Sequence, residues 1–240
     1  MKKTSRTIRV SLLFAGSFAF VALLLSACKK STDFDSNTPV SALMTFNLAP
    51  DKTAIGIAIS GNVLTTTPLN YTSYTGIYQT IFPGSREVTA YDFGGGNTFA
   101  TVSQNFEATK YYSAFVLGAN GTYSNLVVKD ELDSLSATSG QAYVRFINAI
   151  PDSTKPLVTL TANGTDLSNS NAGYATVSSF TAVNPGDVTI KVDNGTTISA
   201  NRTITVEKGK VYTILLTGIP GSTEPAKIVQ IKYITNGSVS

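Results

Sequence analysis

The stretch FEATKYYSAFVLG, from Phe106 to Gly118, recurs 100 residues later as VEKGKVYTILLTG, from Val206 to Gly218. The two stretches share four residues at matching positions: Glu107 and Glu207, Lys110 and Lys210, Tyr112 and Tyr212, and Gly118 and Gly218. Further matches extend the repeat toward the N-terminus: Val88-Thr89 with Val188-Thr189, Pro83-Gly84 with Pro185-Gly186, and Pro50-Asp51 with Pro151-Asp152. Self-similarity at a nearly fixed offset predicts a tandem of two similar domains.

Each copy has the sequence pattern of β-strands. In the second copy, Ala142, Val144 and Phe146 alternate with other residues, which places the three on one face of a strand. Turn sequences such as Asn163-Gly164 and Pro185-Gly186 separate such segments. Short strands with turns about every 8 to 12 residues predict an all-β fold. We therefore expect two antiparallel β-sandwich domains, immunoglobulin-like or transthyretin-like.

The two domains have a predicted boundary at KDELDSLSATSG, which is charged and then rich in small residues, as linkers often are. We expect a first domain over residues 41–128, a linker over residues 129–140 and a second domain over residues 141–236.

The first 27 residues have the pattern of a signal peptide rather than of a folded segment. Four basic residues precede an apolar run from Val10 to Leu25. The tetrad Leu25, Ser26, Ala27 and Cys28 then resembles the bacterial lipobox, which implies cleavage before Cys28 and attachment of lipid to its sulfur. A transmembrane helix is the alternative, because the run approaches the length that spans a bilayer. The lone cysteine after small residues favours the lipobox.

The polar stretch that follows predicts a flexible, lipidated tether over residues 28–40. Lys29 follows the anchor, whereas aspartate at this position resembles an inner-membrane retention signal. We therefore expect an outer-membrane protein attached to the membrane by lipid; the sequence is compatible with the periplasmic or the surface face.

Composition excludes several kinds of chemistry. The 240 residues include no histidine, no tryptophan and one cysteine, so a histidine-based nucleophile system, a histidine metal site and an internal disulfide are all ruled out. All 15 acidic residues and 14 of the 18 basic residues follow Cys28, which leaves a net charge of −1 after cleavage. Such a chain gives no reason to expect binding of nucleic acid.

The second copy also resembles a known family. The segments YVRFINAIPDS, NPGDVTIKV and EKGKVYTILLTG look like the bacterial family called domain of unknown function 4397, often found in lipoproteins of Bacteroidetes. The first copy is similar but more divergent, with TFNLAPDK in place of RFINAIPDS. The resemblance covers residues 41–236 and implies an extracytoplasmic β-sandwich module, without any known activity or catalytic residue.

Tyrosines are the first candidates for a ligand surface, since a tyrosine gives a large amphipathic contact at low cost in conformational entropy. The candidates are Tyr71, Tyr74, Tyr78 and Tyr91, with Tyr111 or Tyr123. They could bind a glycan or a protein; the alternative is that they pack in the core or on strand faces.

Carboxylates are the remaining candidates for catalysis or for calcium. Asp92 lies beside three glycines, and Asp130, Glu131 and Asp133 cluster in the linker, but neither group has the spacing of a calcium loop.

We expect no metal, no cofactor and no enzymatic activity. The preferred hypothesis is a non-catalytic envelope lipoprotein that binds or adheres to a partner. The alternatives are a structural component of an envelope complex and, less favoured, a hydrolase with two carboxylates.

Overall fold

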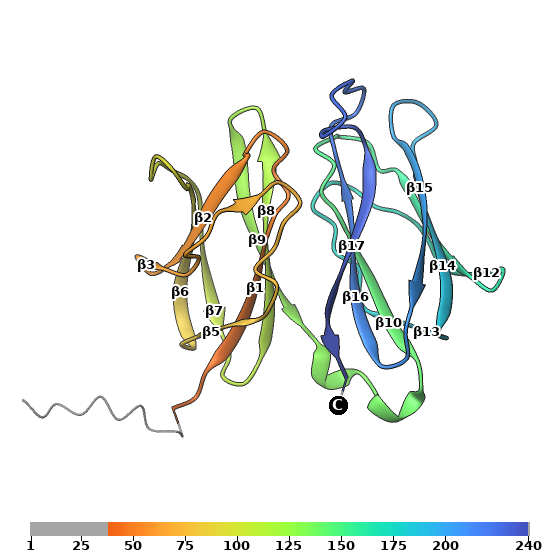
Figure 1. The fold of residues 1–240 in the computed structure, drawn as a ribbon, viewed down its shortest axis with the longest axis horizontal. Helices are drawn as coiled ribbons and strands as arrows, with labels where there is room; N and C mark the ends of the chain where they lie inside the picture. The colour runs from red at the N-terminus through yellow and green to blue at the C-terminus, as the bar shows by residue number, and fades with distance from the viewer. Residues whose placement is uncertain (1–37, 240) are drawn as a thin grey trace, which may run out of the picture. The chain divides into compact units, whose positions relative to one another are not determined.

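A computed structural model describes residues 38–239 of the chain (Figure 1). The predicted signal peptide, Cys28 and nearly all of the predicted tether lie outside the described residues. Within residues 38–239 the structure is all-β, and its only helices are two short 3₁₀ turns in the linker, η1 (Leu132–Ser134) and η2 (Ala137–Ser139). The described part holds no helix with the length and apolar character needed to cross a membrane.

The first copy is a sandwich of two sheets, with strand orders β5-β1-β8-β9 and β3-β2-β6-β7. Strand β4 pairs with β2 outside this order. The strands are β1 (Ser41–Asn47), β2 (Ala54–Ile59), β3 (Asn62–Val63), β4 (Leu69–Asn70), β5 (Gln79–Ile81), β6 (Gly84–Asp92), β7 (Thr98–Phe106), β8 (Tyr111–Ala119) and β9 (Thr122–Asp130).

The second copy repeats this arrangement, with strand orders β13-β10-β16-β17 and β12-β11-β14-β15. Its strands are β10 (Ala142–Asn148), β11 (Leu157–Ala162), β12 (Thr165–Asn171), β13 (Thr181–Val183), β14 (Gly186–Asp193), β15 (Ser199–Val206), β16 (Lys210–Thr217) and β17 (Gln230–Ser238). The predicted all-β tandem of sandwiches is confirmed.

One strand pair in each copy differs from the expected antiparallel pattern. Strand β1 pairs with β8 in parallel, and β10 pairs with β16 in parallel. These central strands are almost entirely buried, as in β10, where all seven residues are buried. Strands buried on both faces read as continuous apolar runs rather than as alternating ones. The expected inward face of Ala142, Val144 and Phe146 packs in the core of the second sandwich, and its opposite face is buried too.

Two repeated tyrosines explain part of the sequence repeat. The hydroxyl of Tyr112 accepts a hydrogen bond from the backbone N–H of Glu107 at 2.9 Å, and Tyr212 accepts one from Glu207 at 3.1 Å. Both rings lie in the core of their own sandwich. This arrangement resembles the tyrosine corner of immunoglobulin-like sandwiches, in which a buried ring ties a loop to the next strand.

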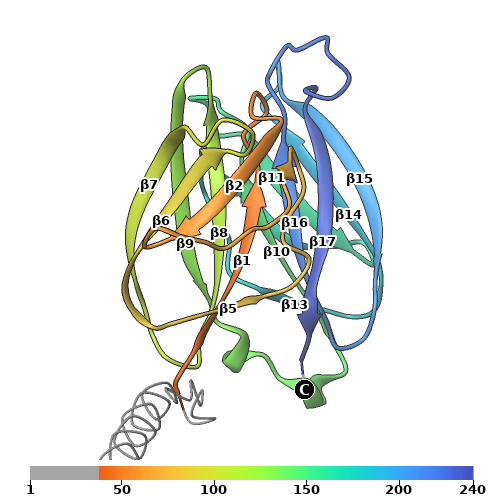
Figure 2. The ribbon, with the colours of Figure 1, turned by 60° about the vertical axis from the view of Figure 1, so that its left-hand side comes forward.

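Residues 39–240 form one compact unit that contains both sandwiches. The sheet of β1 and β8 faces the sheet of β10 and β16, and the outer sheets of the two copies lie on opposite sides (Figures 1 and 2). A third core, separate from the cores of the two sandwiches, fills the space between the facing sheets. We call this contact region the junction; the linker crosses one end of it, at the bottom of Figure 1.

Candidate functional site

The apolar part of the junction has the character of a protein core. Strands β1 and β8 contribute Met44, Phe46, Phe115 and Leu117, and the second copy contributes Ile147, Ala149, Leu215 and Ile234, all of them buried. Phe46 stacks on Tyr74 at 5.6 Å between ring centroids and contacts Phe115 at 4.8 Å. Because these side chains exclude water on both sides of the contact, the two copies are held as one body.

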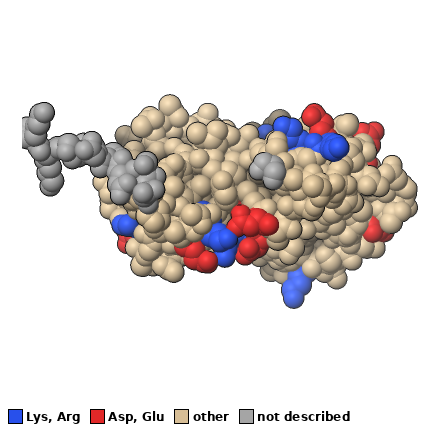
Figure 3. Space-filling model, turned by 90° about the horizontal axis from the view of Figure 1, so that it is seen from below, with Lys and Arg blue, Asp and Glu red and all other residues tan. Residues whose placement is uncertain are grey.

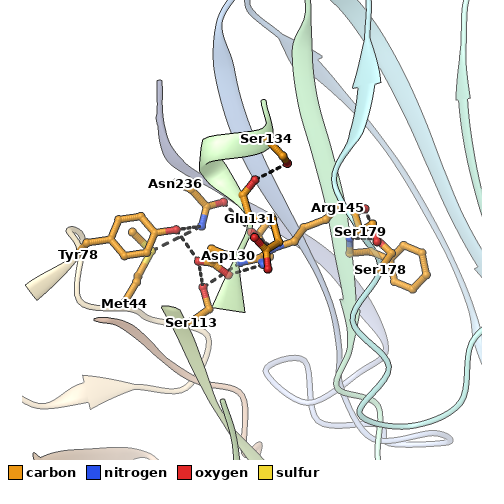
Figure 4. A network of polar contacts seen from close by, with 12 residues as sticks. Met44, Tyr78, Ser113, Asp130, Glu131, Ser134, Arg145, Ser178, Ser179 and Asn236 are labelled. Atoms are coloured by element: carbon orange, nitrogen blue, oxygen red, sulfur yellow. Dashed lines mark hydrogen bonds and ion pairs between the residues drawn. The ribbon is translucent and has the colours of Figure 1, made fainter. Parts of the chain in front are cut away.

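A buried ion pair crosses the junction (Figure 4). Asp130, at the end of β9, accepts a hydrogen bond at 2.5 Å from the Nη1 atom of Arg145 on β10. The side chain of Asp130 is fully buried, and that of Arg145 is 3% exposed. Arg145 also donates to Ser113 at 2.8 Å and to Thr213 at 3.0 Å. These bonds give both charges the polar partners that burial requires.

Tyr78 and Asn236 complete this network. The hydroxyl of Tyr78 donates to Asp130 at 2.6 Å and accepts from the side-chain amide of Asn236 at 3.3 Å. The amide oxygen of Asn236 accepts from Thr213 at 2.6 Å. Burial, and then the charge of Asp130, raise the pKa of Tyr78 far above its ordinary value. Tyr78 is therefore a neutral donor that helps to hold the carboxylate of Asp130 in place.

The two copies meet with approximate two-fold symmetry. Met44 and Arg145 occupy matching positions, because each pairs with the residue after the corner tyrosine, Ser113 or Thr213. Asp130 accepts from Ser113 within the first copy, as Asn236 accepts from Thr213 within the second. Across the junction, Arg145 contacts Asp130, and Met44 contacts Asn236 through its sulfur at 3.8 Å. Reciprocal contacts of this kind are typical of two-fold interfaces, and here only one of the two carries charge.

Alkaline pH should destabilise the fold through tyrosines that are partly or fully buried. Burial raises the pKa of five tyrosines above the ordinary value of 10.0: Tyr71, Tyr78, Tyr123, Tyr174 and Tyr212. A raised pKa in the folded state means that only the unfolded chain loses these protons just above pH 10. The contribution of these tyrosines to the free energy of unfolding should therefore stay constant below pH 10 and decrease as the pH rises further.

This expectation is checked by ultraviolet absorbance of phenolate, followed together with circular dichroism. The five tyrosines with a raised pKa should ionise only as the β-sheet signal disappears. Ionisation of these five near pH 10 in a folded protein would contradict the assignment.

Two pockets flank a pair of tyrosines at the linker end of the junction. Tyr78 and Tyr111 meet edge to face, with centroids 5.1 Å apart and an angle of 78° between the rings. A pocket of about 310 Å³ lies between this pair, the linker and the end of β17, and one of about 350 Å³ lies between the pair and the start of β1. A third pocket, of about 410 Å³, is bounded by the linker, Arg145 and Phe180.

The six tyrosines that the sequence suggested do not form one surface. Tyr74 packs in the junction, and Tyr71 lies near Thr217 and Gly218 of the second copy. Tyr78 and Tyr111 are brought together as described. Of the remaining two, Tyr91 lies over Gly56 on the neighbouring strand, and Tyr123 donates a hydrogen bond to Asp51 at 2.7 Å.

The candidate carboxylates are all engaged in ion pairs. Asp92 pairs with Lys52 at 2.8 Å, Glu131 lies 3.8 Å from Lys129, and Asp133 pairs with Lys110. Asp130 is the buried partner of Arg145. Within residues 38–239, no group of three or more cysteine, aspartate or glutamate residues is arranged to hold a metal ion.

Sequence reasoning did not single out Arg145 or Asn236. A signal for Arg145 was present, because it is the one charge in the apolar strand AYVRFIN, and a charge in a fully buried strand requires a buried partner. No comparable signal marks Asn236, which lies at a β-bulge near the end of β17.

Comparison with known families identifies both copies. The model described as "Domain of unknown function (DUF4397)" matches residues 41–155 and 142–237. The chain belongs to this family. The two DUF4397 matches overlap over β10, the strand that carries Arg145. A comparison with curated proteins found no match.

Several solved structures are distantly similar to this DUF4397 protein. The tip fimbrial protein Mfa3 from Porphyromonas gingivalis is 9% identical and has a TM-score of 0.28; the match covers 83% of this chain and 100% of that one. The family 26 carbohydrate-binding module of Amy13K from Eubacterium rectale is 12% identical, with coverage of 84% and 98% and a TM-score of 0.25. A cell adhesion protein from Bacteroides eggerthii, described as putative, is 13% identical, with coverage of 84% and 96% and a TM-score of 0.26.

Proposed function

We propose that this chain is a non-catalytic lipoprotein of the cell envelope whose two DUF4397 copies act as one rigid body for binding or adhesion. The observation that carries the proposal is the junction, where an apolar core and a buried ion pair join two sandwiches. A rigid scaffold holds the loops and pockets at its ends in fixed relative positions, which lowers the entropic cost of binding a partner.

A non-catalytic role is supported by the state of the carboxylates. A pair of acids that acts in hydrolysis needs one carboxyl free to accept or donate a proton at the substrate. Asp92, Asp130, Glu131 and Asp133 each face a lysine or an arginine instead. Their chemistry is that of structural ion pairs.

Attachment to the membrane rests on Cys28 and on the lipobox residues Leu25, Ser26 and Ala27. The compact unit begins at Pro39, and β1 begins at Ser41, so a short tether would separate the lipid from the folded body. Lys29 after the anchor supports the outer membrane as the location.

Replacing Cys28 by alanine should release the protein from the membrane. The wild type should incorporate radioactive fatty acid and sediment with the outer membrane, because thioether-linked lipid is its anchor. The Cys28→Ala variant should lose both properties, whereas a Ser26→Ala control, which keeps the thiol and a small residue, should retain them. A Cys28→Ala variant that incorporates as much lipid as the wild type would contradict the lipoprotein assignment.

The binding role is tested with the purified full chain in lipid nanodiscs. The protein should bind isolated extracellular polymers or cell surfaces, and empty nanodiscs should not. A stable, stoichiometric envelope partner that co-purifies with the chain, together with no binding to these materials, would replace the proposal by a structural role.

A further inference from the structure

Tyr111 is an exposed aromatic side chain that packs against a buried hydrogen-bond network through its neighbour Tyr78. It begins β8, is 38% exposed and packs against the ring of Tyr78 at its edge. Tyr78 is itself held by the hydrogen bond from its hydroxyl to the buried Asp130. The junction therefore restricts the position of the exposed ring. A ligand that stacks on this ring would lose little binding free energy to ordering of the side chain.

Pockets lie on both sides of the Tyr78–Tyr111 pair. On one side, the pocket of about 310 Å³ is lined by both tyrosines and by Asp133, Asn236 and Ser238. On the other side, the pocket of about 350 Å³ is lined by both tyrosines and by Thr80, Thr109 and Lys110. Each volume is at the lower end of the range for small-molecule sites, about 300–1,000 Å³. A ligand that crosses Tyr111 could fill both.

The charged side chains that line the two pockets beside Tyr78 and Tyr111 have opposite signs. Lys110 lines one pocket, Asp133 lines the other, and the two side chains form an ion pair. Figure 3 views the molecule from below, where the linker lies, and shows basic and acidic side chains side by side on a surface that is mostly uncharged. A strongly anionic or cationic ligand would be attracted by one of these two charges and repelled by the other, whereas a neutral ligand with many hydroxyl groups could bond to both partners.

From these features we propose that Tyr111 and its two flanking pockets bind a neutral oligosaccharide. The negative face of the tyrosine ring attracts the weakly positive C–H groups on one face of a sugar ring. Asp133, Lys110, Ser238 and the threonines supply donors and acceptors for sugar hydroxyls on either side. This inference rests on the proposed binding role and assigns that role a site and a class of ligand.

The test uses the full chain in lipid nanodiscs with cellohexaose, xylohexaose and mannohexaose as neutral probes and trigalacturonic acid as an anionic one. Saturation-transfer NMR should detect binding of at least one neutral probe, and calorimetry should give its affinity. Tyr111→Ala should weaken that affinity at least about tenfold, which corresponds to about 1.4 kcal/mol. Tyr111→Phe, which keeps the ring, should change the affinity less than about twofold.

Tyr233 provides a matched control. It is 37% exposed, close to the 38% of Tyr111, but it lies on β17 beside Arg202 and lines neither pocket. Tyr233→Ala should leave the affinity for the probe unchanged. Equal losses in Tyr111→Ala and Tyr233→Ala would overturn the assignment of the site, as would binding of trigalacturonic acid in preference to the neutral probes.

The failure of this inference can be distinguished from that of the proposed function. If no neutral probe binds while the chain still binds cells or extracellular polymers, the saccharide site is wrong and the binding role stands. If the wild type binds neither the probes nor those materials, both fail.

Discussion

Replacing Asp130 by asparagine is expected to lower the free energy of unfolding by about 3–5 kcal/mol. The variant keeps the shape of the side chain but removes its charge. Arg145, which is 3% exposed, would then be a buried cation without a counterion. Its bonds to Ser113 and Thr213 would remain, but neutral hydroxyls cannot offset the loss of hydration of a full charge. Equilibrium unfolding in urea measures the effect.

The approximate symmetry of the junction supplies the control. On the other side, the matching positions hold Met44 and Asn236, an uncharged pair. The double variant Asp130→Asn with Arg145→Met would install the same pair of residue types on both sides. Well-packed neutral replacements of a buried ion pair are often close to neutral in stability. We therefore expect the double variant to be more stable than either single variant, with a coupling energy of about 2 kcal/mol or more.

Additive losses in the double variant would contradict this account. They would mean that the two side chains stabilise the protein separately and that the charge pair itself contributes little. The unfolding curves also report on the junction directly. We expect a single transition in the wild type, and a weakened contact between the copies should broaden or split it.

The fold could be predicted because burial imposes a period on the sequence. Val188, Ile190 and Val192 on β14 are buried and alternate with exposed or half-buried residues. The repeated Tyr112 and Tyr212 mark the same corner in each copy. Both signals lie within short stretches of sequence, so they can be recognised without knowing how distant strands pair. The parallel pairing of β1 with β8 depends on a long-range contact and had no such signal.

The junction could not be predicted for a related reason. The spacing of Met44 and Phe46 places them on one face of a strand. The sequence does not indicate whether that face contacts water or a second domain. Tyr71, Tyr74 and Tyr78 lie close together in the sequence, yet what each contacts depends on how the two copies dock. Only the strand that holds Arg145 indicated a contact with another part of the chain. An arginine within an apolar run is buried, and its charge then needs a polar partner from another segment.

Substituting alanine for Gly118 is expected to lower the free energy of unfolding by about 3 kcal/mol, from backbone strain and overpacking together. Gly118 has a φ of +117°, and a Cβ atom there would lie 2.1 Å from the carbonyl oxygen of Thr122 on the neighbouring strand. A backbone oxygen cannot rotate away as a side chain could, so the hairpin of β8 and β9 would have to open. Gly218, the matching residue, has a φ of +119° and a corresponding contact of 2.3 Å with Ile228.

A substitution at Gly121, in the turn of the same hairpin, distinguishes backbone strain from overpacking. Its φ of +85° is also unfavourable for alanine, but a Cβ atom there would meet nothing within 4 Å. Gly121→Ala should therefore cost only the strain of its backbone, about 1 kcal/mol. The difference between the two variants, measured by thermal or urea unfolding, isolates the contact with Thr122. Equal losses at Gly118 and Gly121 would show that the shared glycine is kept for its backbone freedom alone. A larger loss at Gly118, matched at Gly218, would show that the repeat keeps glycine where the neighbouring backbone approaches too closely for any side chain.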